Sequence, residues 1–155
     1  MQKALFIFIV AASFFIGCEQ VASTSESKNS NREIEGTWKL ISGTLIEKGD
    51  TTVTDYTKHR SFIKIINKTH FAFLNHDLQK GKDSATAAFG AGGGTYILSG
   101  NQYTEHLEYC TDRAWEGHDF TFTITIQNDT LTQSGVEKIE SEGIKRMNIE
   151  KYVKQ

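Results

Sequence analysis

The sequence predicts an all-β fold, an antiparallel up-and-down barrel of eight or nine strands. Three observations indicate this fold. Short apolar or alternating segments recur along residues 34–155, turn residues separate them, and no segment has the periodicity of a helix. Evenly spaced antiparallel strands are typical of sandwiches and closed barrels, and closure removes the exposed edges of a sheet. A barrel of about eight strands leaves room inside for one small ligand.

The first three predicted strands lie in the first half of this region. Gly36-Thr37-Trp38 begins the first strand, and residues 47–50 form a turn. Residues 61–66 and 70–74 are two further strands, close enough in sequence to pair as a hairpin. A loop rich in Gly, Ala, Lys and Ser follows at residues 78–92, and it could cover one end of the barrel.

The remaining strands follow at short spacing. Residues 95–98 and 102–110 flank a turn that contains Gly100, and we expect a bulge where the preceding glycine run enters this hairpin. Residues 120–126 alternate strictly between apolar side chains and threonine, which predicts a strand with one buried face. Strands at 131–133 and within 144–153 complete the set.

Composition limits the classes of partner. The chain has 155 residues, a formal net charge of −2 and two cysteines. A mildly acidic chain argues against nucleic acid as a partner, because nucleic-acid binding needs a basic face. It also argues against a polybasic patch that would attract a membrane surface. No oligomeric state is indicated.

The N-terminal residues are typical of an exported protein. Lys3 supplies a positive charge, and residues 4–16 are uncharged but too few for a spanning helix, which fits a secretory signal peptide. The end of this run, Phe15-Ile16-Gly17-Cys18, resembles the lipobox of bacterial lipoprotein precursors. The resemblance implies cleavage before Cys18 and lipid on its thiol; the alternative is an ordinary signal peptide with a chance cysteine. Two or more acyl chains make a stable membrane anchor.

These features predict three regions. Residues 1–17 are the signal peptide, residues 18–33 are the lipidated cysteine and a polar tether, and residues 34–155 are the barrel domain. The tether has too few apolar side chains to fold, and about 14 flexible residues reach roughly 20 Å. We expect the protein in a bacterial cell envelope, on the outer membrane rather than the inner one, with Cys110 as a lone thiol.

Gly36-Thr37-Trp38 resembles the Gly-x-Trp opening of the lipocalins. Together with residues 64–71, 92–96 and 103–106, the pattern is similar to lipocalin-like lipoproteins of bacteria related to Bacteroidetes. The resemblance implies a lipocalin-like barrel in which Trp38 closes one end and a late arginine, Arg146, packs on the Trp38 ring.

The predicted strand at residues 102–110 is expected to carry polar contacts of a binding site. Tyr103, Glu105 and Tyr109 share one face, which we predict to point inward because two aromatic rings suit a barrel lumen. His106 and Cys110 share the other face. A carboxylate inside a barrel needs hydrogen-bond partners or a raised pKa. A Glu105 in a structural core network is the alternative to one that contacts a ligand or takes part in catalysis.

The predicted function is binding of a small, partly apolar molecule in the barrel. Glu105 and His70 would supply the polar contacts, and aromatic side chains would line or plug the lumen. These aromatic residues are Trp38, Phe71, Phe73, Tyr96, Tyr103, Tyr109, Phe120 and Phe122.

Two alternatives stay open. One is an enzyme of isomerase or hydratase type that uses His70 and Glu105 for proton transfer, which requires the two side chains to meet. The other is a lipoprotein without a ligand that binds a partner through an exposed apolar patch.

Metal and cofactor sites are not predicted. No histidine and cysteine spacing typical of zinc is present. His106 and Cys110 would lie about 13 Å apart along a strand, too far to share one ion. The glycine run at residues 90–94 lacks the Lys-Ser/Thr pair and the helix of a phosphate loop.

Overall fold

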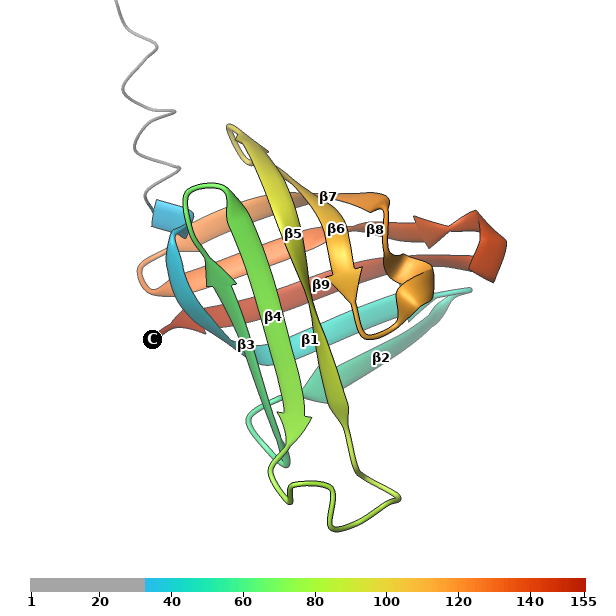
Figure 1. Ribbon diagram of the computed structural model, residues 1–155. Coiled ribbons are helices and arrows are strands. Elements are labelled where there is room, and N and C mark those ends of the chain that lie inside the picture. The colour runs from blue at the N-terminus through green and yellow to red at the C-terminus, as the bar shows by residue number, and fades with distance from the viewer. Residues whose placement is uncertain (1–32) are drawn as a thin grey trace, which may run out of the picture.

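The protein closes one antiparallel sheet into a barrel. The structure is a computed structural model, and it describes residues 33–155 (Figure 1). The sheet order is β2-β1-β3-β4-β5-β6-β7-β8-β9, and β1 also pairs with β9. Eight strands therefore form a closed ring, β2 is an extra strand, and the all-β barrel expected from the sequence is confirmed. The strands are β1 (Gly36–Glu47), β2 (Asp50–Asp55), β3 (Arg60–Ile66), β4 (His70–Asp77), β5 (Phe89–Ser99), β6 (Gln102–Cys110), β7 (His118–Gln127), β8 (Thr130–Ile139) and β9 (Ile144–Lys154).

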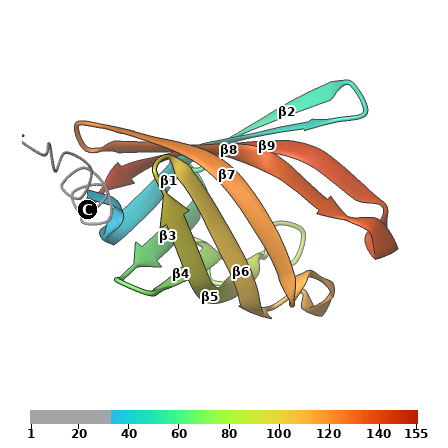
Figure 2. The same ribbon diagram turned by 90° about the horizontal axis from the view of Figure 1, so that it is seen from above.

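β1 joins the ring to the extra strand. Its first residues, Gly36–Lys39, pair with β3, and its last residues, Ser42–Glu47, pair with β2. Its other edge pairs with β9, with a bulge between Leu40 and Ser42. The hairpin of β1 and β2 consequently extends away from the ring (Figure 2).

β2 is missing from the strands that the sequence predicted. Five of its six residues are exposed and one is half-buried, because the strand lies outside the ring. A strand with no buried face carries no alternation of apolar and polar side chains, so sequence periodicity could not reveal it.

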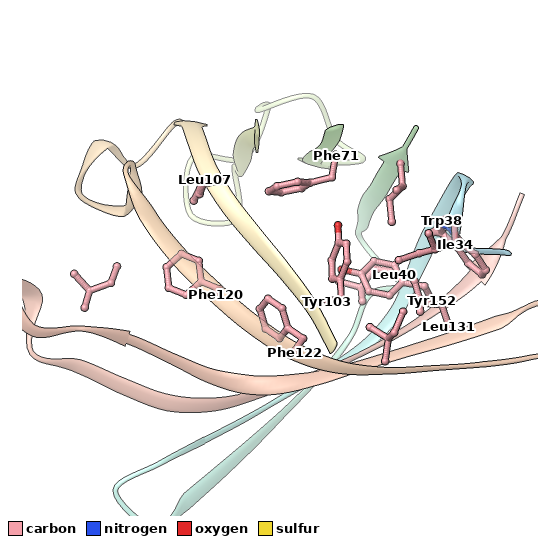
Figure 3. Close-up of a cluster of buried hydrophobic side chains, with 13 residues drawn as sticks. Ile34, Trp38, Leu40, Phe71, Tyr103, Leu107, Phe120, Phe122, Leu131 and Tyr152 are labelled. Carbon is pink, nitrogen blue, oxygen red and sulfur yellow. Dashed lines mark hydrogen bonds between the residues drawn. The ribbon is translucent and has the colours of Figure 1, made fainter. Parts of the chain in front are cut away.

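Alternation does explain the strands of the ring. In β7, Phe120, Phe122 and Ile124 are buried while the threonines between them are exposed. Side chains with this inward phase form one core, and Figure 3 shows them gathered inside the barrel.

Trp38 closes one end of the barrel. Trp38 and Ile34 are fully buried, and the Trp38 Nε1 group donates a hydrogen bond to the Ile34 carbonyl oxygen at 2.7 Å. This hydrogen bond holds the residues just before β1 against the barrel. The described chain therefore begins at the end of the barrel where Trp38 lies (Figure 1).

The glycine run belongs to β5. The loop expected at residues 78–92 was wrong over residues 89–92, because these pair with β4 through contacts such as Asn75 with Gly90. The expected bulge is present: Gly93 pairs with Tyr109 and Gly94 pairs with Leu107, so β6 has one unmatched residue, Glu108.

The predicted signal peptide at residues 1–17, Cys18, and the tether up to residue 32 lie outside the described residues. Among residues 33–155, no helix has the length and apolar character needed to cross a membrane.

Candidate functional site

A cavity of about 290 Å³ lies inside the barrel. This volume is near the lower end of the range for sites that enclose small ligands, roughly 300–1,000 Å³. The wall combines aromatic rings with charged and amide side chains. The aromatic residues are Tyr56, Phe62, Phe73, Trp115, Phe120, Phe122 and Tyr152, and the charged or amide residues are Lys64, Glu105, Asp112, Gln133, Glu137, Arg146, Asn148 and Glu150.

A hydrogen-bonded network crosses the barrel interior between β3, β6, β8 and β9. The Lys64 Nζ group donates to Glu105 Oε1 at 2.7 Å and to Gln133 Oε1 at 3.1 Å. Gln133 Nε2 donates to Glu150 Oε2 at 3.2 Å, and the Tyr152 hydroxyl donates to the same oxygen at 2.7 Å. Four strands thus supply one connected set of polar groups, which a packed apolar core would not require.

Burial dominates the electrostatics of this network. Lys64 is buried, and its ammonium lies 5.4–5.9 Å from the ring centres of Phe71, Tyr103 and Tyr152, a geometry that stabilises a cation. Burial raises the pKa of Glu105; Lys64 opposes this rise and the nearby Glu150 carboxylate adds to it.

The two buried tyrosines remain neutral. Burial and the nearby glutamates raise the pKa of Tyr103 and of Tyr152 well above its ordinary value. The Tyr152 hydroxyl is committed to Glu150, whereas the buried Tyr103 hydroxyl has no hydrogen-bond partner within residues 33–155.

A second polar cluster lies toward the end of the cavity opposite Trp38, where β9 begins. Arg146 Nε donates to Glu137 Oε2 at 2.7 Å, and Asn148 Nδ2 donates to Glu137 Oε1 at 2.7 Å. The Arg146 guanidinium lies 5.0 Å from the Trp115 ring centre, and Trp115 packs on Phe120. This cluster and Trp115 of the 3-10 turn η1 (Arg113–Trp115) line the cavity at this end.

Seven residues predicted to line the lumen, to plug it or to supply its polar contacts lie inside the barrel. Trp38, Phe71 and Tyr103 are buried in the core, and the other four line the cavity, namely Phe73, Glu105, Phe120 and Phe122. An eighth, Tyr96, is half-buried; its ring packs against Tyr103, with ring centres 5.2 Å apart, and its hydroxyl donates to the Asn67 carbonyl oxygen.

The expected inward orientation of Tyr109 was wrong. Tyr109 is 67% exposed, although Tyr103, Glu105 and Leu107 on the same strand point inward. The cause is the bulge at Glu108, which adds one residue to β6 and reverses the facing of the residues after it. Cys110 consequently lines the cavity in place of Tyr109.

The expected place of His70 in the lumen was also wrong. His70 is exposed at the start of β4, where its Nδ1 lies 2.7 Å from the Thr69 hydroxyl. The next residue, Phe71, points inward, so His70 points outward. The barrel wall therefore separates His70 from Glu105, and these residues do not form an acid–base pair.

Arg146 does not pack on Trp38. Trp38 pairs with Lys154 near the end of β9, whereas Arg146 pairs with Glu137 near the beginning of that strand. Lys154 Nζ lies 5.1 Å from the Trp38 ring centre instead, and Arg146 packs on Trp115. The expected stacking of a cation on the tryptophan occurs, but with a different residue.

Most of the charged and amide residues of the cavity were not predicted from the sequence, namely Lys64, Asp112, Gln133, Glu137, Asn148 and Glu150. The alternation of side chains along the strands could have indicated two of these residues. Lys64 lies between Phe62 and Ile66 at inward positions, and Gln133 follows Leu131 in the same way. A polar side chain at an apolar-phase position is the mark of an interior polar site.

No protein-family model matches the chain, and no curated protein is significantly similar to it. Within residues 33–155 there is no group of three or more His, Cys, Asp or Glu side chains placed to hold a metal ion.

Proposed function

We propose that this domain is a lipocalin-like binding protein that takes up one small, partly apolar molecule in the barrel cavity. The observation that carries the proposal is the cavity itself, in which aromatic walls enclose a connected polar network. Pockets for small molecules combine these two features: apolar walls provide affinity at roughly 25 cal/mol per Å² of buried surface, and a few polar groups fix the orientation of the ligand.

We further propose that the chain acts as a lipoprotein in a bacterial cell envelope, on the outer membrane rather than the inner one. The support is the lipobox-like Ile16-Gly17-Cys18 after a short uncharged segment. Lipid on Cys18 would hold the barrel at the membrane surface, where it would meet small molecules of the envelope.

Native mass spectrometry of the protein purified from its own membrane tests the binding function. The wild type is expected to retain a small molecule. Leu45→Trp should lose it, because Leu45 lines the cavity and a larger ring there fills the space. Ile46→Trp is the control, since the neighbouring Ile46 is exposed. A wild type that retains nothing and takes up none of the aromatic probes described below contradicts the proposed function.

A further inference from the structure

The charges that line the cavity do not balance. Four carboxylates and two cationic side chains face it: Glu105, Asp112, Glu137 and Glu150, against Lys64 and Arg146. A cavity with excess negative charge attracts cations and disfavours anions, and a partly enclosed wall strengthens this field.

Both cationic side chains already have an acidic partner. Lys64 lies 2.7 Å from Glu105 Oε1, and Arg146 lies 2.7 Å from Glu137 Oε2. Asn148 satisfies the second oxygen of Glu137. A ligand carboxylate would have to compete with these pairs, so neither cation is a free receptor for an anion.

Glu150 is the interior carboxylate that no cation matches. Its Oε2 atom accepts hydrogen bonds from two neutral donors, Gln133 and Tyr152. Within residues 33–155 its Oε1 atom makes no hydrogen bond, and the side chain is half-buried on the cavity wall. Asp112, the other unmatched carboxylate, is exposed and caps the backbone of η1 at Ala114.

Aromatic rings line the same cavity as this carboxylate. Tyr152, whose hydroxyl binds Glu150, packs edge to face on Phe62, and Phe62 stacks on Phe73. The negative face of an aromatic ring stabilises a nearby cation, and rings next to an acidic group are a means of recognising ammonium groups. The rings and Glu150 therefore favour the same class of ligand.

We infer that the cavity selects a small organic cation, a molecule with an amine or quaternary ammonium group on an apolar body, and that the cationic group binds against Glu150. This inference rests on the proposed function, because it names the class of ligand for the same cavity. The Lys64–Glu105 pair then serves to neutralise the deep end of the site, and Glu150 remains as the receptor.

Three probes of similar size and different charge test this inference on the purified full-length protein. They are benzyltrimethylammonium, neutral benzyl alcohol and anionic phenylacetate, each titrated by calorimetry and by ligand-observed NMR. The cation is expected to bind about tenfold or more tightly than the neutral probe, which corresponds to one charge-stabilising contact, and phenylacetate should bind weakest.

Glu150→Gln is the decisive variant. The glutamine still offers an oxygen to Gln133 and Tyr152, so the fold is preserved while the charge is lost. The cation should bind about tenfold more weakly to this variant, and benzyl alcohol should bind as before. Glu142→Gln removes the same charge at an exposed position and should change neither affinity.

The outcomes separate this inference from the proposed function. If benzyl alcohol binds as tightly as the cation, or if phenylacetate binds best, the preference for a cation is overturned while the binding function stands. Equal loss of cation binding in Glu142→Gln also overturns the role of Glu150. If none of the three probes binds and native mass spectrometry finds no retained molecule, the proposed function itself fails.

Discussion

Lys64 and Glu105 form an ion pair inside the barrel, with 3% and 9% of their side chains exposed. Taking two charges out of water is costly, and their attraction offsets that cost only because the geometry is close and further groups assist. Gln133 accepts a hydrogen bond from Lys64, and three aromatic rings face the ammonium. Each partner is therefore tolerated in the interior because the other is present.

Loss of either partner should destabilise the fold strongly. Lys64→Met and Glu105→Gln are each expected to lower the free energy of unfolding by about 3–5 kcal/mol, because a buried charge is left uncompensated. The double variant should lose less than the sum of the two single losses, by about 1 kcal/mol or more. Urea unfolding measures all four proteins. Losses that add up in the double variant would contradict the coupling between Lys64 and Glu105. Lys58→Met is the control: it breaks an exposed pair with Asp55 and should change the free energy of unfolding little.

The same pair makes a prediction about pH. In Lys64→Met the cation that opposes burial is gone, so the pKa of Glu105 rises further above its ordinary value of 4.5. The folded state then holds a proton that the unfolded chain releases. The stabilisation that this bound proton gives is fully present below the pKa of Glu105 in the unfolded chain. It is lost as pH rises through the raised pKa of Glu105 in the folded protein.

Unfolding of Lys64→Met between about pH 4 and pH 8 tests this sign. Its free energy of unfolding should fall with rising pH relative to that of the Lys64→Met/Glu105→Gln double variant, which cannot titrate at this position. A constant difference between the two variants would show that Glu105 does not carry the effect.

At the scale of elements, the glycines of β5 let neighbouring strands approach closely. A Cβ atom at Gly94 would overlap the carbonyl oxygen of His106, and one at Gly92 would overlap the Phe73 ring. The missing side chains let β6 approach closely at the bulge and let Phe73 turn into the cavity. The reversal of β6 that brings Cys110 into the cavity depends on this close approach.

Gly94→Ala should therefore destabilise the barrel. The expected loss is about 1–3 kcal/mol or more, because backbone atoms of the neighbouring strand must move to admit one methyl group. Gly90→Ala is the matched control on the same strand: its Cβ would meet nothing within 4 Å, so its stability should stay the same or rise slightly. Thermal unfolding compares the two variants, and equal melting temperatures would contradict the role of Gly94.

The strands differ in how well the sequence predicts them. β7 was predicted because one of its faces is buried, and its apolar and polar side chains alternate accordingly. The orientation of Tyr109 was missed because a bulge is a property of two paired strands, β5 and β6, and the pattern of β6 alone does not contain it. Similarly, Lys64 and Glu105 are 41 residues apart in sequence, so their pairing follows from barrel closure rather than from local spacing.

At the scale of the whole molecule, the two ends of the barrel have different surroundings. The described chain begins next to Ile34 and Trp38, whereas Trp115 and Arg146 line the cavity at the opposite end. With lipid on Cys18, the proposed attachment lies on the Trp38 side of the domain. The part of the cavity that Trp115 and Arg146 line is then on the side of the barrel away from the point of attachment.

Attachment by lipid predicts a difference between the two cysteines. Cells grown with radiolabelled palmitate should label the wild type and Cys110→Ala but not Cys18→Ala, because the proposed lipobox would direct acylation to Cys18 alone. A chain that begins at Glu19, exported behind a signal peptide without a lipobox, should be recovered in the soluble fraction with the same unfolding transition and the same probe affinities. Label on Cys18→Ala would contradict lipidation at this position. Salt weakens contacts between exposed charges. If the Glu19 chain stays with the membrane in high salt, the barrel binds the membrane through its own surface, and the lipid is not the sole attachment.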